Sequence, residues 1–372
     1  FAAIIRKYPF PEGAFDPRGR ALSSFLASEH RCKLQNRRFR LRRSRVNKGV
    51  PFEAELHRMR SFVRNALGDS YDLAQIYRNC DFGPGANIGT HGNATHIGRK
   101  LDRSWSVSPG ALYYAYGAIM NHAQFREVLI PGHGGFSDGT GESAFPRFLD
   151  RTDVVHYNKI AFVPKTAKTD RSIAVEPSLN SFIQKGIDKV MRLKLKRIGI
   201  DLTDQTINQR LAREGATHGT HCTIDLSSAS DSIATEVVRE LLPPAWFEIL
   251  NATRSTHFLV DGVSRRYEKF CSMGNGFCFP LESLLFAAAV HAVSSLNPGT
   301  SYHVYGDDIV MPSDYFEPLV ALLRYLGFRV NPTKTFSEGP FRESCGADYF
   351  GGEDVRPYTL AERLDSLSAL FK

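Results

Sequence analysis

The feature that most restricts the fold of this chain is a pair of adjacent carboxylates inside an apolar stretch. Tyr305-Gly306-Asp307-Asp308 leads directly into the apolar residues 309–311. Glycine and aspartate favour tight turns and the apolar flanks favour strands, so the stretch predicts a hairpin centred on Gly306. Two carboxylates at a hairpin tip form a compact, oxygen-rich site suited to Mg²⁺. A plain hairpin explains these four residues equally well, so other parts of the chain must decide between the two interpretations.

A second group of carboxylates lies earlier in the chain. Asp225 falls in an apolar strand expected at residues 222–226, and Asp231 follows it after five intervening residues. Either aspartate could simply cap the next helix, as Asp beside Ser often does. Phosphoryl transfer with two metal ions about 4 Å apart, however, needs carboxylates from at least two strands. Asp225 together with Asp307 and Asp308 would supply them.

Three cations occupy a loop between two predicted strands. Lys165, Lys168 and Arg171 lie between residues 159–163 and residues 172–175. Such a group could hold a triphosphate, with the arginine binding through its bidentate fork. Taken alone, the loop would be ordinary protein surface.

A glycine-rich turn precedes a long apolar helix expected at residues 281–294. Ser272, Gly274 and Asn275 belong to this turn. Its glycines permit close approach of the backbone to a ligand, although the same turn could merely link a strand to a helix.

The densest basic run spans residues 31–48 and contains no Asp or Glu. A solvated helix face or tail is the ordinary interpretation of such a run. The net charge of +8 and the isoelectric point of about 9.2 favour a polyanionic partner. Beside the carboxylate groups, contact with a nucleic-acid backbone becomes the better interpretation for Arg37, Arg38, Arg40 and Arg42.

The order of the predicted elements indicates an α+β fold, with helices packed on one face of a sheet. Periodicity and helix-breaking residues predict strands, hairpins and helices in alternation after residue 157. The predicted helices cover residues 177–198, a segment ending at Leu242 before Pro243-Pro244, residues 281–294 and residues 316–326, and a hairpin is expected at 258–270.

Taken in this order, the motifs resemble those of the replicase catalytic subunit of the leviviruses, the Qβ-type RNA bacteriophages. The resemblance is dense from about Lys159 to Gly352 and thinner before that. The matching stretches are the basic loop with Val163-Pro164-Lys165 and Thr169-Asp170-Arg171, residues 200–209, Asp225 with Asp231, residues 272–276, residues 305–308, Lys334 and residues 337–346.

The resemblance implies a right-hand polymerase, with fingers, a palm built on an antiparallel sheet, and a thumb. It implies RNA-directed RNA synthesis from nucleoside triphosphates, with two Mg²⁺ ions, or Mn²⁺ in their place. Carried over by position, the metal ligands are Asp225, Asp307 and Asp308. The nucleotide-binding residues are Lys165, Lys168, Arg171, Ser272, Gly274 and Asn275, together with Asp231 at the ribose 2′-hydroxyl. Lys334 falls where the family has a candidate general acid for the leaving pyrophosphate, and Arg37, Arg38, Arg40 and Arg42 would contact RNA.

The same resemblance divides the chain into four parts. We expect a basic N-terminal region at residues 1–70, fingers at 71–210, the palm with finger insertions at 211–345, and the start of the thumb at 346–372. Family members continue well beyond Lys372, so most of the thumb is expected to be missing, and a chain that begins at Phe1 suggests a fragment or a processed product.

One residue departs from the wider polymerase class. Cys278 stands where threonine is expected, and a thiol is a weaker hydrogen-bonding group than a hydroxyl. The contacts that recognise the ribose are therefore expected to differ here.

The expected partners are an RNA template and its product, nucleoside triphosphates, the host elongation factors Tu and Ts, and a small-subunit ribosomal protein. A membrane is not expected, because the longest apolar stretch, residues 284–292, is too short to cross one. Six scattered cysteines without a CxxC pair indicate free thiols in a reducing compartment. Together these point to the cytoplasm of an infected bacterial host.

Two alternatives stay open. A reverse transcriptase shares the palm and the paired aspartates but would be expected to carry a bulky side chain where residues 228–231 are small or polar. The second alternative is a non-catalytic basic RNA-binding protein. Unpaired acids such as Asp225 and Asp307 count against it, because they would repel RNA.

Overall fold

The computed structural model describes residues 15–44, 51–90, 97–102, 104–129 and 144–357 of the chain. These residues form a mixed α/β arrangement of helices around four small sheets. The predicted α+β class is confirmed, because most of the paired strands are antiparallel.

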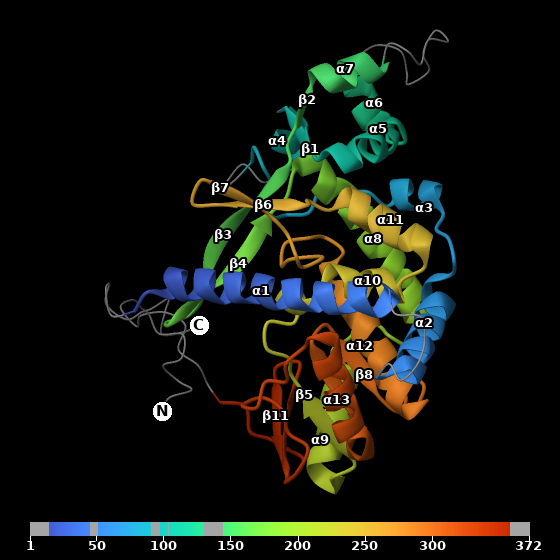
Figure 1. The fold of residues 1–372 in the computed structure, drawn as a ribbon, viewed down its shortest axis with the longest axis vertical. Helices are drawn as coiled ribbons and strands as arrows, with labels where there is room; N and C mark the ends of the chain where they lie inside the picture. Colours follow the sequence, from blue (N-terminus) through green and yellow to red (C-terminus); the bar gives the residue numbers. More distant parts are fainter. Residues whose placement is uncertain (1–14, 45–50, 91–96, 103, 130–143, 358–372) are drawn as a thin grey trace.

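The long helix α1 (Pro17–Ser44) runs across the middle of the molecule (Figure 1). Phe25, Cys32 and Phe39 recur every seven residues, lie on one face of the helix and are buried. The first half of α1 packs through Phe25 against Phe258, with ring centroids 5.0 Å apart. Farther along, the Gln35 side chain donates a hydrogen bond of 2.6 Å to the Tyr325 carbonyl oxygen. The helix therefore joins parts of the chain that are distant in sequence.

The helices from α3 to α8 form the part of the molecule drawn above α1, whereas α2 lies beside the right-hand end of α1 (Figure 1). Helix α8 is the centre of the upper part, because α3, α5 and β1 all pack on it. Strands β1 and β2 pair in parallel, with Trp105 opposite Thr152. The elements are α2 (Glu53–Leu67), α3 (Leu73–Arg78), α4 (Ile97–Asp102), β1 (Trp105–Val107), η2 (Pro109–Ala111), α5 (Leu112–Met120), α6 (Ala123–Leu129), α7 (Ala144–Asp150), β2 (Thr152–Val154) and α8 (Ser178–Arg197).

A four-stranded sheet in the order β4-β3-β6-β7 lies above the first half of α1 (Figure 1). Its long hairpin consists of β3 (Tyr157–Thr166) and β4 (Thr169–Val175). The two strands were predicted at 159–163 and 172–175 but extend farther, so Lys165 and Arg171 lie on strands and not on a loop. Strand β6 (His257–Val260) runs parallel to β3, and β7 (Val263–Arg266) forms an edge.

A three-stranded antiparallel sheet in the order β5-β9-β8 carries the paired aspartates. It consists of β5 (His221–Ile224), β8 (His303–Tyr305) and β9 (Asp308–Pro312), and the β8–β9 turn is the predicted hairpin at Gly306. Helix α9 (Thr206–His218) packs on all three strands, and the almost fully buried α12 (Cys278–Ser294) packs on β8.

The remaining elements complete this half of the molecule. The predicted helix at 316–326 is confirmed as α13 (Phe316–Leu326). Three short antiparallel strands follow it and pack on α9. The elements are η4 (Ser230–Ser232), α10 (Thr235–Leu241), α11 (Pro244–Thr253), η5 (Ser313–Tyr315), β10 (Phe341–Ser344), β11 (Ala347–Phe350) and β12 (Glu353–Asp354).

Several predicted element boundaries differ from the structure. The strand expected at 222–226 ends at Ile224, because β9 begins opposite it and the next residues bond instead to the segment around Asn331. Pro243-Pro244 ends one helix but also begins α11, since proline is well tolerated in the first turn of a helix.

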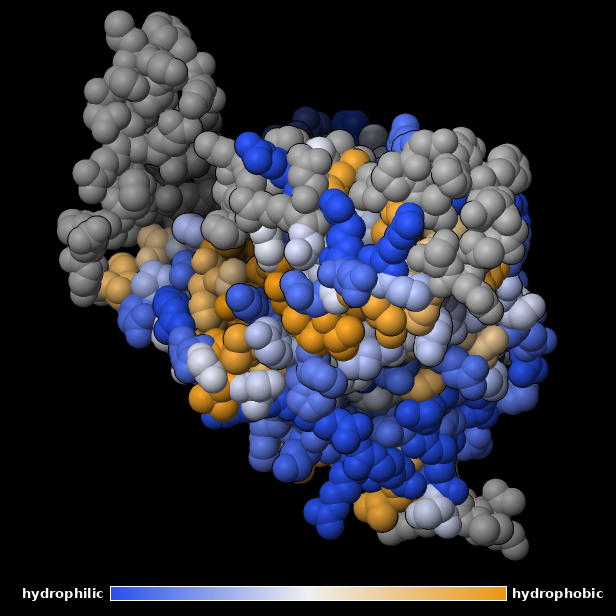
Figure 2. All heavy atoms as spheres, turned by 90° about the horizontal axis from the view of Figure 1, so that it is seen from above, coloured by the Kyte–Doolittle hydropathy of each residue, from blue (hydrophilic) through white to orange (hydrophobic). Residues whose placement is uncertain are grey.

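The face seen in Figure 2 is largely hydrophilic and is interrupted by hydrophobic patches. Within the described parts of the chain, no helix is both long enough and apolar enough to cross a membrane.

Candidate active site at a carboxylate-lined pocket

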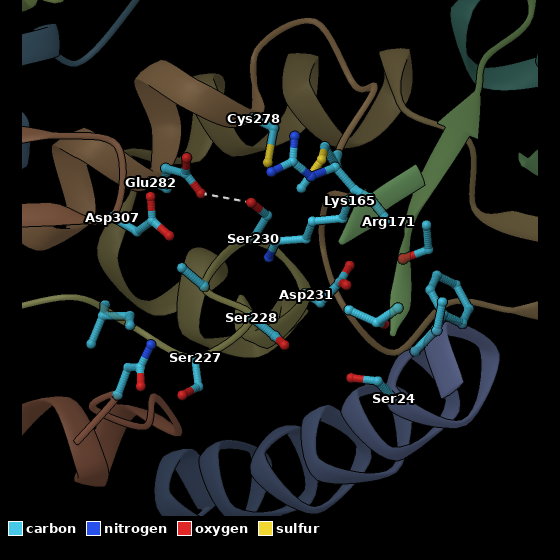
Figure 3. A pocket seen from close by; sticks show the side chains of 18 of the residues that line it. Ser24, Lys165, Arg171, Ser227, Ser228, Ser230, Asp231, Cys278, Glu282 and Asp307 are labelled. Carbon is cyan, nitrogen blue, oxygen red and sulfur yellow. Dashed lines mark hydrogen bonds between the residues drawn. The ribbon is translucent and has the colours of Figure 1, made fainter. Parts of the chain in front are cut away.

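A pocket of about 750 Å³ lies where α1, the β3–β4 hairpin and the β5-β9-β8 sheet meet. Asp307 and Glu282 lie on one side of it, and Lys165 and Arg171 lie on the opposite side (Figure 3). Ser24 of α1 contributes to its edge. The pocket therefore places acidic and basic side chains from distant parts of the chain around one space.

Asp225 and Asp307 both line the pocket. Ile224 pairs with Ile309, so the end of β5 lies beside the turn between β8 and β9. Asp225 directly follows Ile224, and Asp307 occupies the turn. The prediction that these two aspartates come together from neighbouring strands is consistent with this register.

Asp308 occupies a different position from its neighbour. It begins β9, is not among the residues that line the pocket, and accepts a hydrogen bond from the Cys345 backbone N–H. Burial, followed by the negative charge of Asp307, raises the pKa of Asp308 to about 7. The two adjacent carboxylates therefore lie in different surroundings.

The electrostatics of the pocket couple the acids to each other and to nearby cations. Burial is the main cause that raises the pKa of Asp225, and the charge of Asp307 raises it further. Burial also raises the pKa of Asp307, while the positive charges of Lys165, Lys334 and Arg171 oppose that rise. Close, half-buried carboxylates of this kind are stabilised in their charged form by a cation placed between them.

The donor set fits a hard divalent cation. No group of three or more His, Cys, Asp or Glu side chains that could hold a metal ion occurs within the described ranges. Mg²⁺, however, usually binds through one or two protein carboxylates together with substrate phosphates and water. Asp225 and Asp307 line one pocket, and the negative charge of Asp307 raises the pKa of Asp225, as expected of carboxylates that share a cation site.

Not all of the predicted triphosphate-binding cations line the pocket. Lys165 and Arg171 line the pocket from the two strands of one hairpin. Lys168 does not line it, and its Nζ lies 5.5 Å from the centre of the Phe15 ring. Lys334 also lines the pocket, and its Nζ donates a hydrogen bond of 2.5 Å to Glu343 Oε1.

The glycine-rich turn is held against β4. The Ala174 N–H donates a hydrogen bond of 2.7 Å to the Met273 carbonyl oxygen. Gly274 has a φ of +106°, and a Cβ built there would lie 2.2 Å from the Ala174 carbonyl oxygen, so only glycine fits. Gly274 and Asn275 line the pocket, whereas Ser272 is buried and does not.

Cys278, the residue that departs from the wider class, lines the pocket at the start of α12. Its sulfur lies 3.1 Å from the sulfur of Cys271, and both residues are free cysteines. The thiol is therefore engaged with a second thiol behind the pocket.

Asp231 lines the pocket and is bound by a residue that the sequence analysis did not select. The Lys269 Nζ donates a hydrogen bond of 2.5 Å to Asp231 Oδ1. No sequence signal identified Lys269, because a lysine between Glu268 and Phe270 is typical of an exposed strand end.

Glu282 lines the pocket and was also missed by the sequence analysis. It lies in the apolar helix α12, and the Ser230 hydroxyl donates a hydrogen bond of 2.9 Å to its carboxylate (Figure 3). Burial, followed by the charge of Asp307, raises the pKa of Glu282 to about 8. A single carboxylate inside an apolar helix was a usable signal, since an acidic residue is rarely buried without a reason.

The basic run of α1 is partly occupied by ion pairs within the protein. Arg42 is only 9% exposed and pairs with Glu240 and Glu53. Arg40 pairs with Glu236. Arg38 stacks 4.0 Å from the centre of the Tyr325 ring, and Arg37 is exposed. Residues 45–48 of the run lie outside the described residues.

Comparison with known proteins places the chain among viral replicases. The family model "RNA replicase, beta-chain" matches residues 2–372. The chain is 40% identical over 376 residues to the RNA-directed RNA polymerase subunit beta of Qbeta virus (strain MX1), which covers 99% of this chain and 60% of that protein. It is 47% identical over 325 residues to the RNA-directed RNA polymerase beta chain of Escherichia phage MS2, covering 84% of this chain and 54% of that protein.

The chain thus spans 60% or less of the length of these two relatives. Among solved structures, it is similar to the RNA-dependent RNA polymerase of a human picobirnavirus, with a TM-score of 0.41 and 15% identity over 55% of this chain and 46% of that one.

Proposed function

The chain belongs to the RNA replicase beta-chain family, and on that premise we propose that it catalyses RNA-directed RNA synthesis. The reaction is transfer of a nucleoside monophosphate from a nucleoside triphosphate to the 3′-hydroxyl of an RNA strand. The observation that carries the proposal is that Asp225 and Asp307 reach one pocket from neighbouring strands, with Lys165 and Arg171 facing them.

In this proposal the acidic side of the pocket binds the metal ions. Asp225 and Asp307 hold Mg²⁺, and Asp308, which begins β9 beside them, is the third ligand expected from the family motif. When bound, the ions lower the pKa of the attacking hydroxyl and stabilise the charge on the leaving pyrophosphate. The carboxylates fix where the reacting groups must lie.

The basic side of the pocket binds the triphosphate. Arg171 has the planar fork that matches two phosphate oxygens, and Lys165 adds a point charge beside it. Lys168 does not line the pocket, so its part in phosphate binding requires movement of the β3–β4 turn.

The proton that the pyrophosphate takes up comes from Lys334 in this proposal. Its ammonium lines the pocket and is hydrogen-bonded to Glu343. Glu343 is not among the residues that line the pocket, so in this proposal the ammonium turns from that carboxylate to reach the leaving group.

The sugar is read by Asp231 and the glycine-rich turn. Asp231 lines the pocket and accepts a hydrogen bond from the ribose 2′-hydroxyl, while Gly274 and Asn275 approach the nucleotide through the backbone. Ser272 is buried behind this turn, so in this proposal it supports the turn and makes no direct contact.

The proposed parts of the right hand follow the order expected from the family. The basic region at 1–70 contains α1 and α2, the fingers at 71–210 contain the β3–β4 hairpin, and the palm at 211–345 contains the β5-β9-β8 sheet. The thumb begins in residues 346–372, of which 358–372 lie outside the described residues.

The proposed partners are an RNA template, its product and, in the assembled enzyme, the host elongation factors Tu and Ts with a small-subunit ribosomal protein. Family membership and the net charge of +8 support this assignment, and the proposed location is the cytoplasm of an infected bacterium. RNA contact by Arg37 is supported by its exposure on α1, whereas Arg38, Arg40 and Arg42 also contact other residues of the protein.

The test is incorporation of nucleotides by the full-length protein on an RNA template, with ribonucleotides or deoxyribonucleotides and with Mg²⁺ present or chelated. Template-dependent incorporation of ribonucleotides that stops on chelation is expected. Preferential use of deoxyribonucleotides would assign the chain to reverse transcription, and no incorporation with either would overturn the polymerase assignment.

A further inference from the structure

The most unusual buried charge in the described residues is the ammonium of Lys269. Its side chain is 0% exposed. The Nζ lies 2.5 Å from Asp231 Oδ1 and 3.9 Å from Glu29 Oε1, and it stands 3.6 Å from the centre of the Phe25 ring. A fully buried ammonium therefore sits between a pocket carboxylate and a residue of α1.

The backbone around Lys269 is fixed on two sides. Glu29 Oε2 accepts a hydrogen bond of 2.6 Å from the Glu268 N–H, and Asn36 donates one of 2.7 Å to the Glu268 carbonyl oxygen. The Phe270 N–H donates one of 2.7 Å to the Ile233 carbonyl oxygen. Because both neighbours of Lys269 are held, the backbone fixes the point from which its side chain extends.

A lysine in a connecting segment, such as the one after β7, would ordinarily extend its flexible stem to solvent, where the ammonium is hydrated. Removing that charge from water costs several kcal/mol unless good partners replace the water. Here Glu29 and Asp231 supply two carboxylates and Phe25 supplies an aromatic face. Such a group is a means of fixing its partners in place rather than a source of net stability.

The partner that is fixed belongs to the pocket. Asp231 is 17% exposed and lies in the short 3-10 helix η4, with one carboxylate oxygen bound to Lys269. Without the ammonium, a side chain at such a turn could rotate to the nearby hydroxyls or to water. With Oδ1 held, Oδ2 is the oxygen left to a ligand in the pocket.

We propose that Lys269 is a positioning residue for sugar selection: it holds Asp231 so that Oδ2 accepts the hydrogen bond of a ribose 2′-hydroxyl. This inference rests on the proposed polymerase function.

The test compares Lys269→Met with Glu29→Gln in the full-length protein. The first variant removes the cation that holds Asp231, and the second alters the same buried cluster but leaves the 2.5 Å bond in place. The double variant Lys269→Met/Glu29→Gln restores the charge balance, so it provides a folded protein if Lys269→Met alone unfolds. Thermal unfolding of each variant is measured alongside activity.

The readout is the ratio of kcat/KM for a ribonucleotide to kcat/KM for the matching deoxyribonucleotide. Loss of one hydrogen bond to a charged group corresponds to about a tenfold fall in this ratio. The fall comes from a lower kcat/KM for the ribonucleotide, while kcat/KM for the deoxyribonucleotide stays the same. We expect that fall in both variants that lack Lys269 and an unchanged ratio in Glu29→Gln. We also expect Lys269→Met to have no further effect on the ratio when Asp231 is already alanine.

An unchanged ratio in the variants that lack Lys269, with only the thermal midpoint lowered, would overturn the inference and leave Lys269 as a structural residue. An equal further fall in the Asp231→Ala background would also overturn it, because Lys269 would then act by another route. These results are distinguishable from failure of the polymerase assignment, which would show as a parent protein without template-dependent synthesis. In that case, nucleotide binding is measured by fluorescence titration. The inference is overturned as well if the parent and Lys269→Met/Glu29→Gln have the same ratio of ribonucleotide affinity to deoxyribonucleotide affinity.

Discussion

The Asn331 side chain donates a hydrogen bond of 2.6 Å to Asp225 Oδ2, and the Asn331 backbone N–H donates one of 2.8 Å to the Asp225 carbonyl oxygen. Together these bonds fasten the segment after α13 to the end of β5. The side-chain bond favours the charged carboxylate and opposes the rise in the pKa of Asp225 that burial causes.

Replacing Asn331 with alanine should therefore weaken catalysis most at low pH. Without the amide donor the pKa of Asp225 rises further, so the acid limb of the rate profile moves to higher pH. Loss of a hydrogen bond to a charged group corresponds to roughly a tenfold loss of kcat/KM. The profile is measured from pH 5 to 9 beside Asn121→Ala, whose exposed side chain is remote from the pocket. An unmoved acid limb would show that Asn331 does not act through Asp225.

Asp225→Asn and Asp307→Asn should each abolish synthesis while the fold remains. A neutral amide cannot balance a divalent cation, and loss of several kcal/mol of charge stabilisation costs at least about a thousandfold in rate. Asp314→Asn changes an exposed aspartate of the same region and serves as the control. Activity within about tenfold of the parent in a folded variant would contradict the two-metal assignment.

Glu282 should make the protein less stable as the pH rises from about 5 to 8. Its pKa is raised to about 8 in the folded protein from an ordinary value of 4.5. Between these values the unfolded chain loses the proton and the folded chain keeps it, so stability falls with rising pH. Glu282→Gln lacks this dependence, and its thermal midpoint should improve relative to the parent between pH 5.5 and 8. Glu317→Gln, at an exposed position of α13, should show no such trend.

Two arginines of α1 should respond differently to replacement by glutamine. Arg37 is exposed, so its loss should flatten the dependence of log K on log salt for RNA binding by about 0.7–0.9. Arg42 is held by Glu53 and Glu240, so its loss should lower the thermal midpoint and leave the salt dependence unchanged. If Arg37→Gln and the parent show the same slope of log K against log salt, the Arg37 side chain is solvated and does not contact RNA.

Local signals predicted the elements well where the information lies in neighbouring residues. The hairpin at Gly306 and the helix Phe316–Leu326 follow from turn residues and from apolar periodicity, and both are confirmed. The approach of Asp225 to Asp307 was predicted from the chemistry that joins them rather than from any local pattern. The hydrogen bond from Asn331 to Asp225 was not predicted, because the two residues lie 106 positions apart.

Lys269, which was missed, and Arg42, which was assigned to RNA contact, have one cause in common. Lys269 has no distinguishing neighbours, and its partner Asp231 lies 38 residues earlier. Arg42 was grouped with the exposed cations because charge alone does not show that Glu240 lies opposite it, 198 residues later. Burial of charged groups is decided by such distant pairs, and a single sequence does not display them.

The position of α1 has a consequence for the order of events on the ribosome. Gln35 of this helix bonds to Tyr325, which is 290 residues later in the chain. At about 5–20 residues per second, Tyr325 is made roughly 15–60 s after Gln35. For that time the buried face of α1, with Phe25, Cys32 and Phe39, lacks this part of its docking surface. Helix α1 thus waits for a much later part of the chain before it docks fully, and until then the nascent chain carries an uncovered apolar stripe that chaperones can bind.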